Sequence, residues 1–284
     1  MPAVDFHQHL WPESLIRALE RRSAPPLLRG SRLELTVEPA AEVDLDAHLP
    51  ERRLALLDRD GIDVAVLSPA PTLELEGHED LHDAYHEGIA ELVRATGGRF
   101  VALSLGVCLP DFAGACVSTG ALQAGIGPLL AELRDAGQLL FVHPGPPAAL
   151  PPRAPSWWPA VVDYTAQMQA AYAAFLSHPD EYADVPIVFA MLAGGGPFQL
   201  ERLRSRGLEL RTALRGNVYL ETSSYGRRAL ELCLATFGVT QLLYGSDAPV
   251  IDPRAGLEAV LGFGKGVTDM VLDETPSRLL GLLS

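Results

Sequence analysis

The chain alternates short apolar runs with longer segments of helical period, and this alternation constrains its fold more than any other feature. A strand followed by a helix, repeated along a chain, is the pattern of β-α units around a parallel sheet. Barrels of eight such units commonly take roughly 250 residues. We therefore predict an α/β chain folded as one (β/α)8 TIM-barrel domain over residues 1–284. Its strands are expected at 3–7, 63–67, 100–105, 115–117, 139–143, 187–192, 218–221 and 242–246.

Two departures from a regular barrel are expected. Only about ten residues separate the third strand from the fourth, and they include Pro110 and Gly114, whereas a crossover between parallel strands usually needs a dozen or more. The third helix should therefore be shortened or missing. Residues 31–38 alternate polar and apolar side chains between two proline-bearing loops, which predicts a small solvent-facing strand or hairpin inserted after the first strand.

Helices are expected where apolar residues recur with helical spacing. Ser14 is a candidate N-cap for the first of them, and Gly61 is expected to end the second. The expected ranges are 14–22, 48–60, 79–95, 127–136, 158–176, 197–206 and 226–237, with further helix from about 256, including 276–280.

Composition excludes several classes of partner. The chain has 22 basic and 36 acidic residues, a net charge of −14 that repels nucleic-acid phosphates and anionic lipids. It has no basic and apolar leader at the N-terminus and no apolar stretch of the roughly 20 residues that span a bilayer. The three cysteines are widely spaced and predict buried thiols rather than disulfides or a zinc cluster. We expect a cytoplasmic protein with a small-molecule substrate and no nucleic-acid or membrane partner; a homo-oligomer stays open.

Four ionisable residues stand at the ends of predicted strands. His7 and His9 are two apart, so both side chains point to the same face of their strand. His143 is followed by Pro144, and Asp247 likewise ends an apolar run. Parallel strands of a barrel end at one mouth, and an unpaired ionisable group there is costly to bury, so shared coordination of one metal ion accounts for all four. Alternatively, the two histidines are an accidental surface pair, and His143 and Asp247 are hydrogen-bonded strand ends.

These four residues and the segments around them resemble those of the amidohydrolase superfamily. Within it, the chain is similar to the branch of aminocarboxymuconate-semialdehyde decarboxylase, aromatic-acid decarboxylases and pyrone-dicarboxylate lactonase. The resemblance spreads over nearly the whole chain. It is carried by Asp5-Phe6-His7-Gln8-His9-Leu10-Trp11-Pro12, Phe141-Val142-His143-Pro144-Gly145, Gly245-Ser246-Asp247-Ala248-Pro249 and the ending Ser277-Arg278-Leu279-Leu280-Gly281-Leu282.

The resemblance implies a role for each matching residue. His7, His9, His143 and Asp247 would be metal ligands, and Asp247 would also manage the proton of a metal-bound water. Many members carry a histidine at the end of strand six that polarises the substrate carbonyl, but Leu192 stands in that place here. Leucine cannot donate a hydrogen bond, and Tyr225, after the seventh strand, is a catalytic candidate to replace that donor.

The lysine content favours a single metal ion. Relatives with two ions bridge them with a modified lysine or a glutamate from strand four, and residues 115–119 contain neither. Lys265 is the only lysine of the chain, and it lies among glycines rather than at a strand end, which makes a Schiff-base mechanism a poor match. The expected cofactor is one divalent ion, with Zn²⁺ preferred and Mn²⁺ as the alternative.

Other residues are candidates for substrate contact. Trp157 and Trp158 lie in a proline-rich segment after His143, which is either a lid with apolar walls or a rigid surface excursion. Glu221 ends the seventh strand and should face the mouth. Arg153 and Arg227 are candidates to bind an anion. Asp163, Tyr164 and Gln167 either look inward or form a solvated first turn; the remaining histidines, 48, 78, 82, 86 and 178, are taken as surface or structural.

Three hypotheses of function follow. The leading one is hydrolysis of a small ester, lactone or amide, in which Asp247 takes the proton of a water activated by the metal. The second is non-oxidative decarboxylation of an aromatic or unsaturated acid, with the metal on the carboxylate or hydroxyl group of the substrate. The third is a barrel that has lost catalysis and acts as a binding protein, for which Leu192 is the best support.

Overall fold

The computed structural model describes residues 1–208 and 216–282, except for the side chain of Pro179. Eight parallel strands pair side by side, and their hydrogen bonds confirm the predicted (β/α)8 barrel. The last strand returns to the first: the amide of Phe6 donates to the carbonyl of Tyr244 at 2.7 Å, and the amide of His9 to that of Ala248 at 2.8 Å. The strands are, in barrel order, β1 (Val4–Gln8), β5 (Val64–Leu67), β6 (Phe100–Leu105), β7 (Gly114–Ser118), β8 (Leu139–His143), β9 (Ile187–Phe189), β10 (Val218–Glu221) and β11 (Leu242–Leu243).

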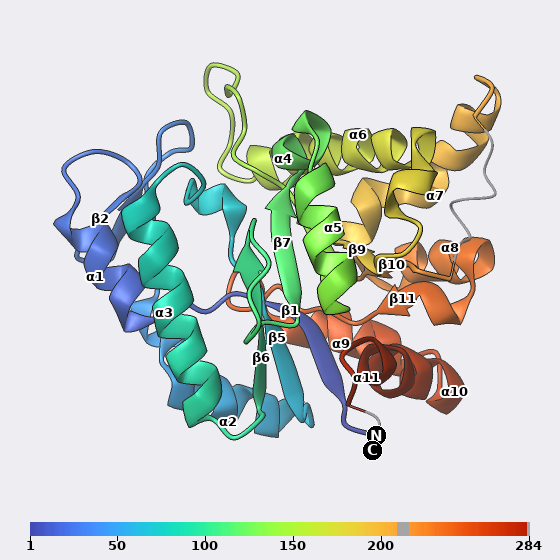
Figure 1. Cartoon of the computed structure of the whole chain (residues 1–284), viewed down its shortest axis with the longest axis horizontal. Helices are drawn as coiled ribbons and strands as arrows, with labels where there is room; N and C mark the ends of the chain where they lie inside the picture. Colours follow the sequence, from blue (N-terminus) through green and yellow to red (C-terminus); the bar gives the residue numbers. More distant parts are fainter. Residues whose placement is uncertain (209–215, 283–284) are drawn as a thin grey trace.

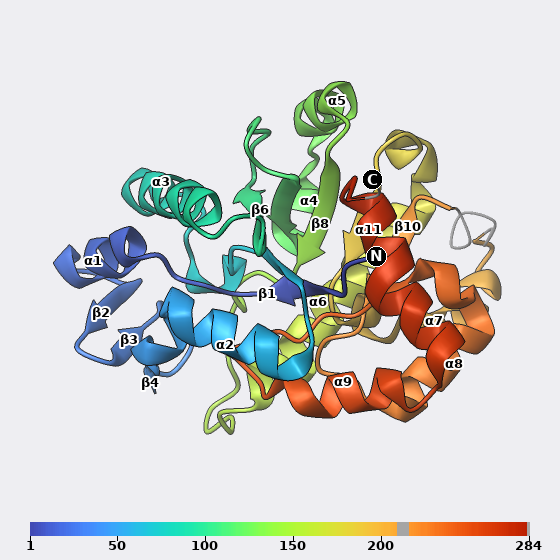
Figure 2. The same ribbon diagram turned by 90° about the horizontal axis from the view of Figure 1, so that it is seen from below.

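Helices surround the strands, as Figures 1 and 2 show from two sides. The apolar side chains between these two layers and inside the barrel form one buried core. The helices are α1 (Glu13–Arg21), α2 (Pro50–Asp60), α3 (Glu79–Ala95), α4 (Thr119–Ala124), α5 (Gly127–Ala136), α6 (Tyr164–Ser177), α7 (Met191–Arg204), α8 (Arg227–Phe237), α9 (Pro253–Leu261), α10 (Lys265–Thr268) and α11 (Thr275–Leu279), with a π-helical turn η3 (Pro159–Asp163) directly before α6 and another, η7 (Asp269–Glu274), before α11. None of the helices in the described part of the chain has the length and apolarity needed to cross a membrane.

The missing third helix is confirmed. Residues 106–113, which connect β6 to β7, form turns and contain no helix. Two helices, α4 and α5, lie instead between β7 and β8. The short connection leaves β6 and β7 as direct neighbours in the barrel, with Leu103 paired to Gly114.

The insertion after the first strand is larger than the predicted hairpin. It is an antiparallel sheet of three short strands, β2 (Leu27–Arg29), β3 (Arg32–Glu34) and β4 (Ala41–Glu42). Thr36 ties it to the segment after β5, since its amide donates to Glu74 at 2.8 Å. On the other side, the hydroxyl of Tyr164 at the start of α6 donates to the carboxylate of Glu38. The insertion is thus joined to two separate βα connections.

Two local expectations were wrong. The sixth strand ends at Phe189, not at 192, because the five residues from Met191 to Gly195 all have positive φ angles and cannot continue a strand. This left-handed turn precedes the right-handed part of α7. Ser14 does not cap α1: Pro12 occupies that position, and the hydroxyl of Ser14 donates to the carbonyl of Ala84 at 2.6 Å.

Candidate metal centre and its cavity

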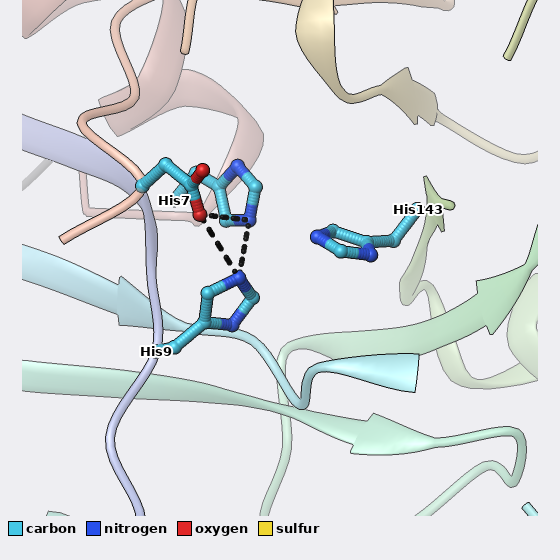
Figure 3. A group of neighbouring side chains, drawn as sticks. His7, His9 and His143 are labelled. Atoms are coloured by element: carbon cyan, nitrogen blue, oxygen red, sulfur yellow. Dashed lines mark hydrogen bonds and ion pairs between the residues drawn. The ribbon is translucent and has the colours of Figure 1, made fainter. Parts of the chain in front are cut away.

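Four side chains from distant parts of the chain meet at the mouth of the barrel. His7 lies in β1, His9 just after it, His143 at the end of β8, and Asp247 four residues beyond β11. One ligand atom from each lies within 4.8 Å of the other three. Figure 3 shows the three imidazole rings turned toward a common point. The convergence expected of these strand ends is therefore present.

The outer nitrogens of two histidines fix how their rings are protonated. Nδ1 of His9 lies 2.9 Å from the carbonyl oxygen of Ser68, and Nδ1 of His143 lies 2.9 Å from that of Pro144. A carbonyl only accepts hydrogen bonds, so each Nδ1 must carry the proton. In the neutral rings, Nε2 is then a free lone pair that points into the cluster, as a metal ligand requires.

His7 is held in the same way by a carboxylate. Its Nδ1 lies 2.9 Å from Oε2 of Glu221, while its Nε2 lies only 3.1 Å from Nε2 of His9. Two neutral imidazoles with protonated Nδ1 atoms would place two lone pairs against each other at that distance. Oδ1 of Asp247 adds a negative charge 3.1 Å from the Nε2 of His9. A cation among these atoms removes the repulsion, so the donor set fits one divalent metal ion.

Burial and charge shift the pKa values of the cluster in different directions. Burial lowers the pKa of His143 well below its usual value, and the neighbouring His7 and His9 lower it further. Burial also opposes charging of His7, but the carboxylate of Glu221 outweighs it and raises that pKa. For Asp247, burial acts to raise the pKa, yet the close contact with His9 and the nearby imidazoles of His7 and His143 lower it overall. Asp247 is therefore ionised at neutral pH.

Glu221 sits behind the cluster. It is fully buried, and besides His7 its carboxylate accepts from the hydroxyl of Ser223 at 2.8 Å and the amide of Met191 at 3.3 Å. We expected Glu221 to face the substrate, and its observed contacts are with these three residues. Its position sets the orientation of His7, in the way that carboxylates commonly hold metal-binding histidines.

The space for Glu221 depends on a glycine. A Cβ built on Gly245 would lie 2.0 Å from Oε1 of Glu221. We expect Gly245→Ala to lower the free energy of unfolding by about 1–3 kcal/mol, because either the carboxylate or the backbone must move. Thermal unfolding measures this, with Gly256→Ala as the control: the nearest atom there, on Tyr244, is 3.7 Å away. An unchanged unfolding temperature for Gly245→Ala would contradict the close packing.

A cavity of about 590 Å³ opens above the cluster, and His7, His9, His143 and Asp247 all line it. Much of the remaining wall is apolar and comes from the insertion and from the segments after β5 and β11. This is a typical size for a small-molecule site. The cavity places the four candidate ligands where a substrate can reach them.

Several other candidate residues lie away from this wall. Trp157 is 54% exposed, and neither it nor Trp158 is among the described residues that line the cavity; the two rings stack on each other with centroids 6.0 Å apart. Arg153 is exposed and also outside the lining. Arg227 packs over the ring of Phe263 and donates to the carbonyl of Gly262 at 2.8 Å. A role of these residues in substrate binding stays a prediction that the cavity does not support.

The region of the missing strand-six histidine is arranged unexpectedly. Leu192 is buried and does not line the cavity, whereas Met191 does. Tyr225 is outside the lining and hydrogen bonds with Thr165, so its catalytic role also stays a prediction; Ser224 beside it does line the cavity. A thioether is a weak acceptor and no donor. Met191 therefore cannot donate a hydrogen bond to a substrate, as a histidine at this place would.

Sequence reasoning missed His48, which it took as a surface or structural residue. The ring is 5% exposed, stacks on Trp11 with centroids 4.5 Å apart, and lines the cavity. The amide of Trp11 donates to Nδ1 at 3.1 Å, which leaves the proton on Nε2. Burial, with Arg53 and His9 nearby, lowers the pKa of His48 to about 3, so the ring is a neutral donor.

Tyr164 and Glu38 also line the cavity. Tyr164 was one of three residues considered to look inward. Gln167 instead bridges Thr119 and the backbone of Gly145 at 2.8 and 2.9 Å, outside the lining. No local signal marks Glu38 or His48, since both reach the cavity only through the path of the insertion.

Comparison with protein families agrees with this geometry. The amidohydrolase family model matches residues 114–282, which is more than half of the chain. The chain belongs to the amidohydrolase family. None of the curated protein sequences matches this family member significantly. The matched range includes His143 and Asp247, while His7 and His9 lie before it.

Solved structures of similar fold cover almost the whole amidohydrolase chain. IDCase from Metarhizium anisopliae in its apo form has a TM-score of 0.83 at 20% identity, over 99% of this chain and 97% of that one. The 5-carboxyvanillate decarboxylase LigW from Sphingomonas paucimobilis gives 0.72 at 17%, over 99% of each chain. The 5-carboxyvanillate decarboxylase from Novosphingobium aromaticivorans, complexed with manganese and 4-hydroxy-3-methoxy-5-nitrobenzoic acid, gives 0.72 at 16%, over 99% and 96%. At these identities, the likeness shows a shared fold.

Proposed function

We propose that this amidohydrolase is a metal-dependent decarboxylase of a small aromatic or unsaturated carboxylic acid. The observation that carries the proposal is the convergence of three Nε2 atoms and one carboxylate within 4.8 Å at the floor of a largely apolar cavity. Two of the similar folds are named as decarboxylases of an aromatic acid, which supports the same choice. The hydrolase that we expected first from the sequence becomes the second candidate.

One divalent ion is proposed at His7, His9, His143 and Asp247. When bound, it would supply positive charge that holds and orients the carboxylate and hydroxyl oxygens of the substrate. Zinc and manganese both accept imidazole and carboxylate ligands, and the donor set does not separate them. The apolar wall keeps bulk water away from the reacting carbon.

The residues of the chain handle the proton and the orientation. Loss of carbon dioxide leaves an electron pair on carbon, which must take up one proton. Asp247 is the proposed carrier: it takes a proton from solvent or from a substrate hydroxyl and gives it to that carbon. His48 donates from Nε2 to a substrate oxygen, because its other nitrogen is already an acceptor for the amide of Trp11. His48 can therefore supply the hydrogen bond that the strand-six histidine supplies in relatives.

Hydrolysis of an ester, lactone or amide keeps one observation in its favour. Asp247 is ionised and lies 3.1 Å from the Nε2 of His9, so it could also accept the proton of a water. Carbonyl hydrolysis also needs a donor on the carbonyl oxygen. Met191, near the place where relatives have a histidine, cannot donate, so hydrolysis too would depend on His48.

A direct comparison of products tests the two candidates. We expect metal-loaded protein to release carbon dioxide from hydroxybenzoates, measured by a coupled bicarbonate assay, and to leave a panel of esters and lactones intact. If the esters and lactones are hydrolysed and the hydroxybenzoates release no carbon dioxide, hydrolysis is the function and the decarboxylase proposal is wrong. If protein that holds its metal forms neither product, the third hypothesis, a binding protein, is favoured.

A further inference from the structure

The cavity of the proposed decarboxylase is negatively charged apart from the candidate ligand cluster. Among the described residues, its wall contains no lysine or arginine, but it contains the carboxylates of Glu38, Glu42 and Asp44 besides Asp247. His48 adds no positive charge, because its pKa lies at about 3. A substrate carboxylate therefore finds a counter-charge only at the metal centre.

Of these three carboxylates, Glu38 should repel a negatively charged substrate group most strongly. Glu42 and Asp44 are exposed, so water and salt screen their charges, whereas Glu38 is half-buried. The hydroxyl of Tyr164 donates to Oε1 of Glu38, and the carboxylate retains lone pairs for a second donor. Burial raises the pKa of Glu38, the hydrogen bond from Tyr164 opposes this rise, and the nearby carboxylates of Glu74 and Asp163 add to it, so other negative charges lie close to Glu38.

We propose that the cavity selects acids with a single carboxylate and a hydroxyl or amino substituent that donates to Glu38, and that it rejects dicarboxylates. This inference rests on the proposed function, since it assumes that one carboxylate lies at the metal centre. Wherever a second carboxylate pointed, it would meet no cation on the described wall, and near Glu38 it would meet a like charge. Like charges a few ångströms apart in a partly buried site repel each other, so a second carboxylate near Glu38 would weaken binding.

Two ligands that differ at one position test the proposal. 3-Hydroxybenzoate and isophthalate share a benzoate and differ only in a hydroxyl or a carboxylate at the meta position. We expect isothermal titration calorimetry of the metal-loaded protein to give a Kd for 3-hydroxybenzoate at least about tenfold below that for isophthalate. Glu38→Gln removes the charge and keeps an acceptor, so this ratio should fall to within about threefold.

Glu34→Gln is the matched control, because it removes the same charge from the same insertion at a residue outside the lining. Its ratio should equal that of the natural protein. Equal or tighter binding of isophthalate by the natural protein would overturn the charge selection while leaving decarboxylation intact, and this comparison needs no variant. An unchanged ratio in Glu38→Gln would also overturn it. If neither acid binds to metal-loaded protein, the decarboxylase proposal fails together with this one.

Discussion

His7→Ala is expected to remove both the metal ion and turnover, with a loss of activity of about 10³-fold or more. His7 is 1% exposed and lies at the centre of the cluster: its Nε2 is 3.1 Å from that of His9 and 3.9 Å from Oδ1 of Asp247. Without this ring, the remaining ligands no longer surround the site. Elemental analysis of purified protein should find about one divalent ion per chain in the natural protein and almost none in the variant.

His178→Ala is the control for this experiment. His178 follows α6, is exposed, and should be replaceable without loss of metal or activity. Asp247→Asn tests the other function of the cluster, since asparagine keeps an oxygen ligand but cannot carry the proton. Metal content and turnover equal to those of the natural protein in both His7→Ala and Asp247→Asn would contradict the proposed centre.

Glu221→Gln is expected to weaken metal binding by about 10–100-fold while the protein stays folded. The carboxylate accepts from Nδ1 of His7, and an amide in its place loses the negative charge that orients the ring and increases its basicity. Competition with a chelator of known affinity measures the change. Glu231→Gln alters a partly exposed carboxylate on α8 in the same way and should keep the natural affinity.

Glu221→Ala should have a larger effect, on stability as well. Alanine leaves His7, the hydroxyl of Ser223 and the amide of Met191 without their buried acceptor. Removing one partner of such a buried charged network costs about 3–5 kcal/mol. Chemical denaturation of the metal-free protein measures this loss in the free energy of unfolding separately from metal binding. An affinity for metal that is unchanged in both variants would show that Glu221 does not position His7.

The parts of the fold that were predicted correctly depend on features that are local in the chain. Short apolar runs and the helical spacing of apolar residues, together with the proline and glycine residues that end these segments, were sufficient to predict the barrel. The short connection between the third and fourth runs was sufficient to predict the missing third helix. Strand six was misjudged because Met191, Leu192 and Ala193 carry no local mark of a left-handed backbone. Only contacts such as that of the Met191 amide with Glu221 hold them there.

The sequence by itself determined that His7, His9, His143 and Asp247 stand at strand ends, and parallel strands of a barrel bring their ends to one mouth. The tertiary structure alone decided which side chains surround them. Glu38 meets Tyr164 across 126 positions of the chain, and His48 reaches the cavity through the course of the insertion. Such contacts depend on how loops pack over the barrel, and the spacing of residues along a chain does not encode the direction in which a loop folds back.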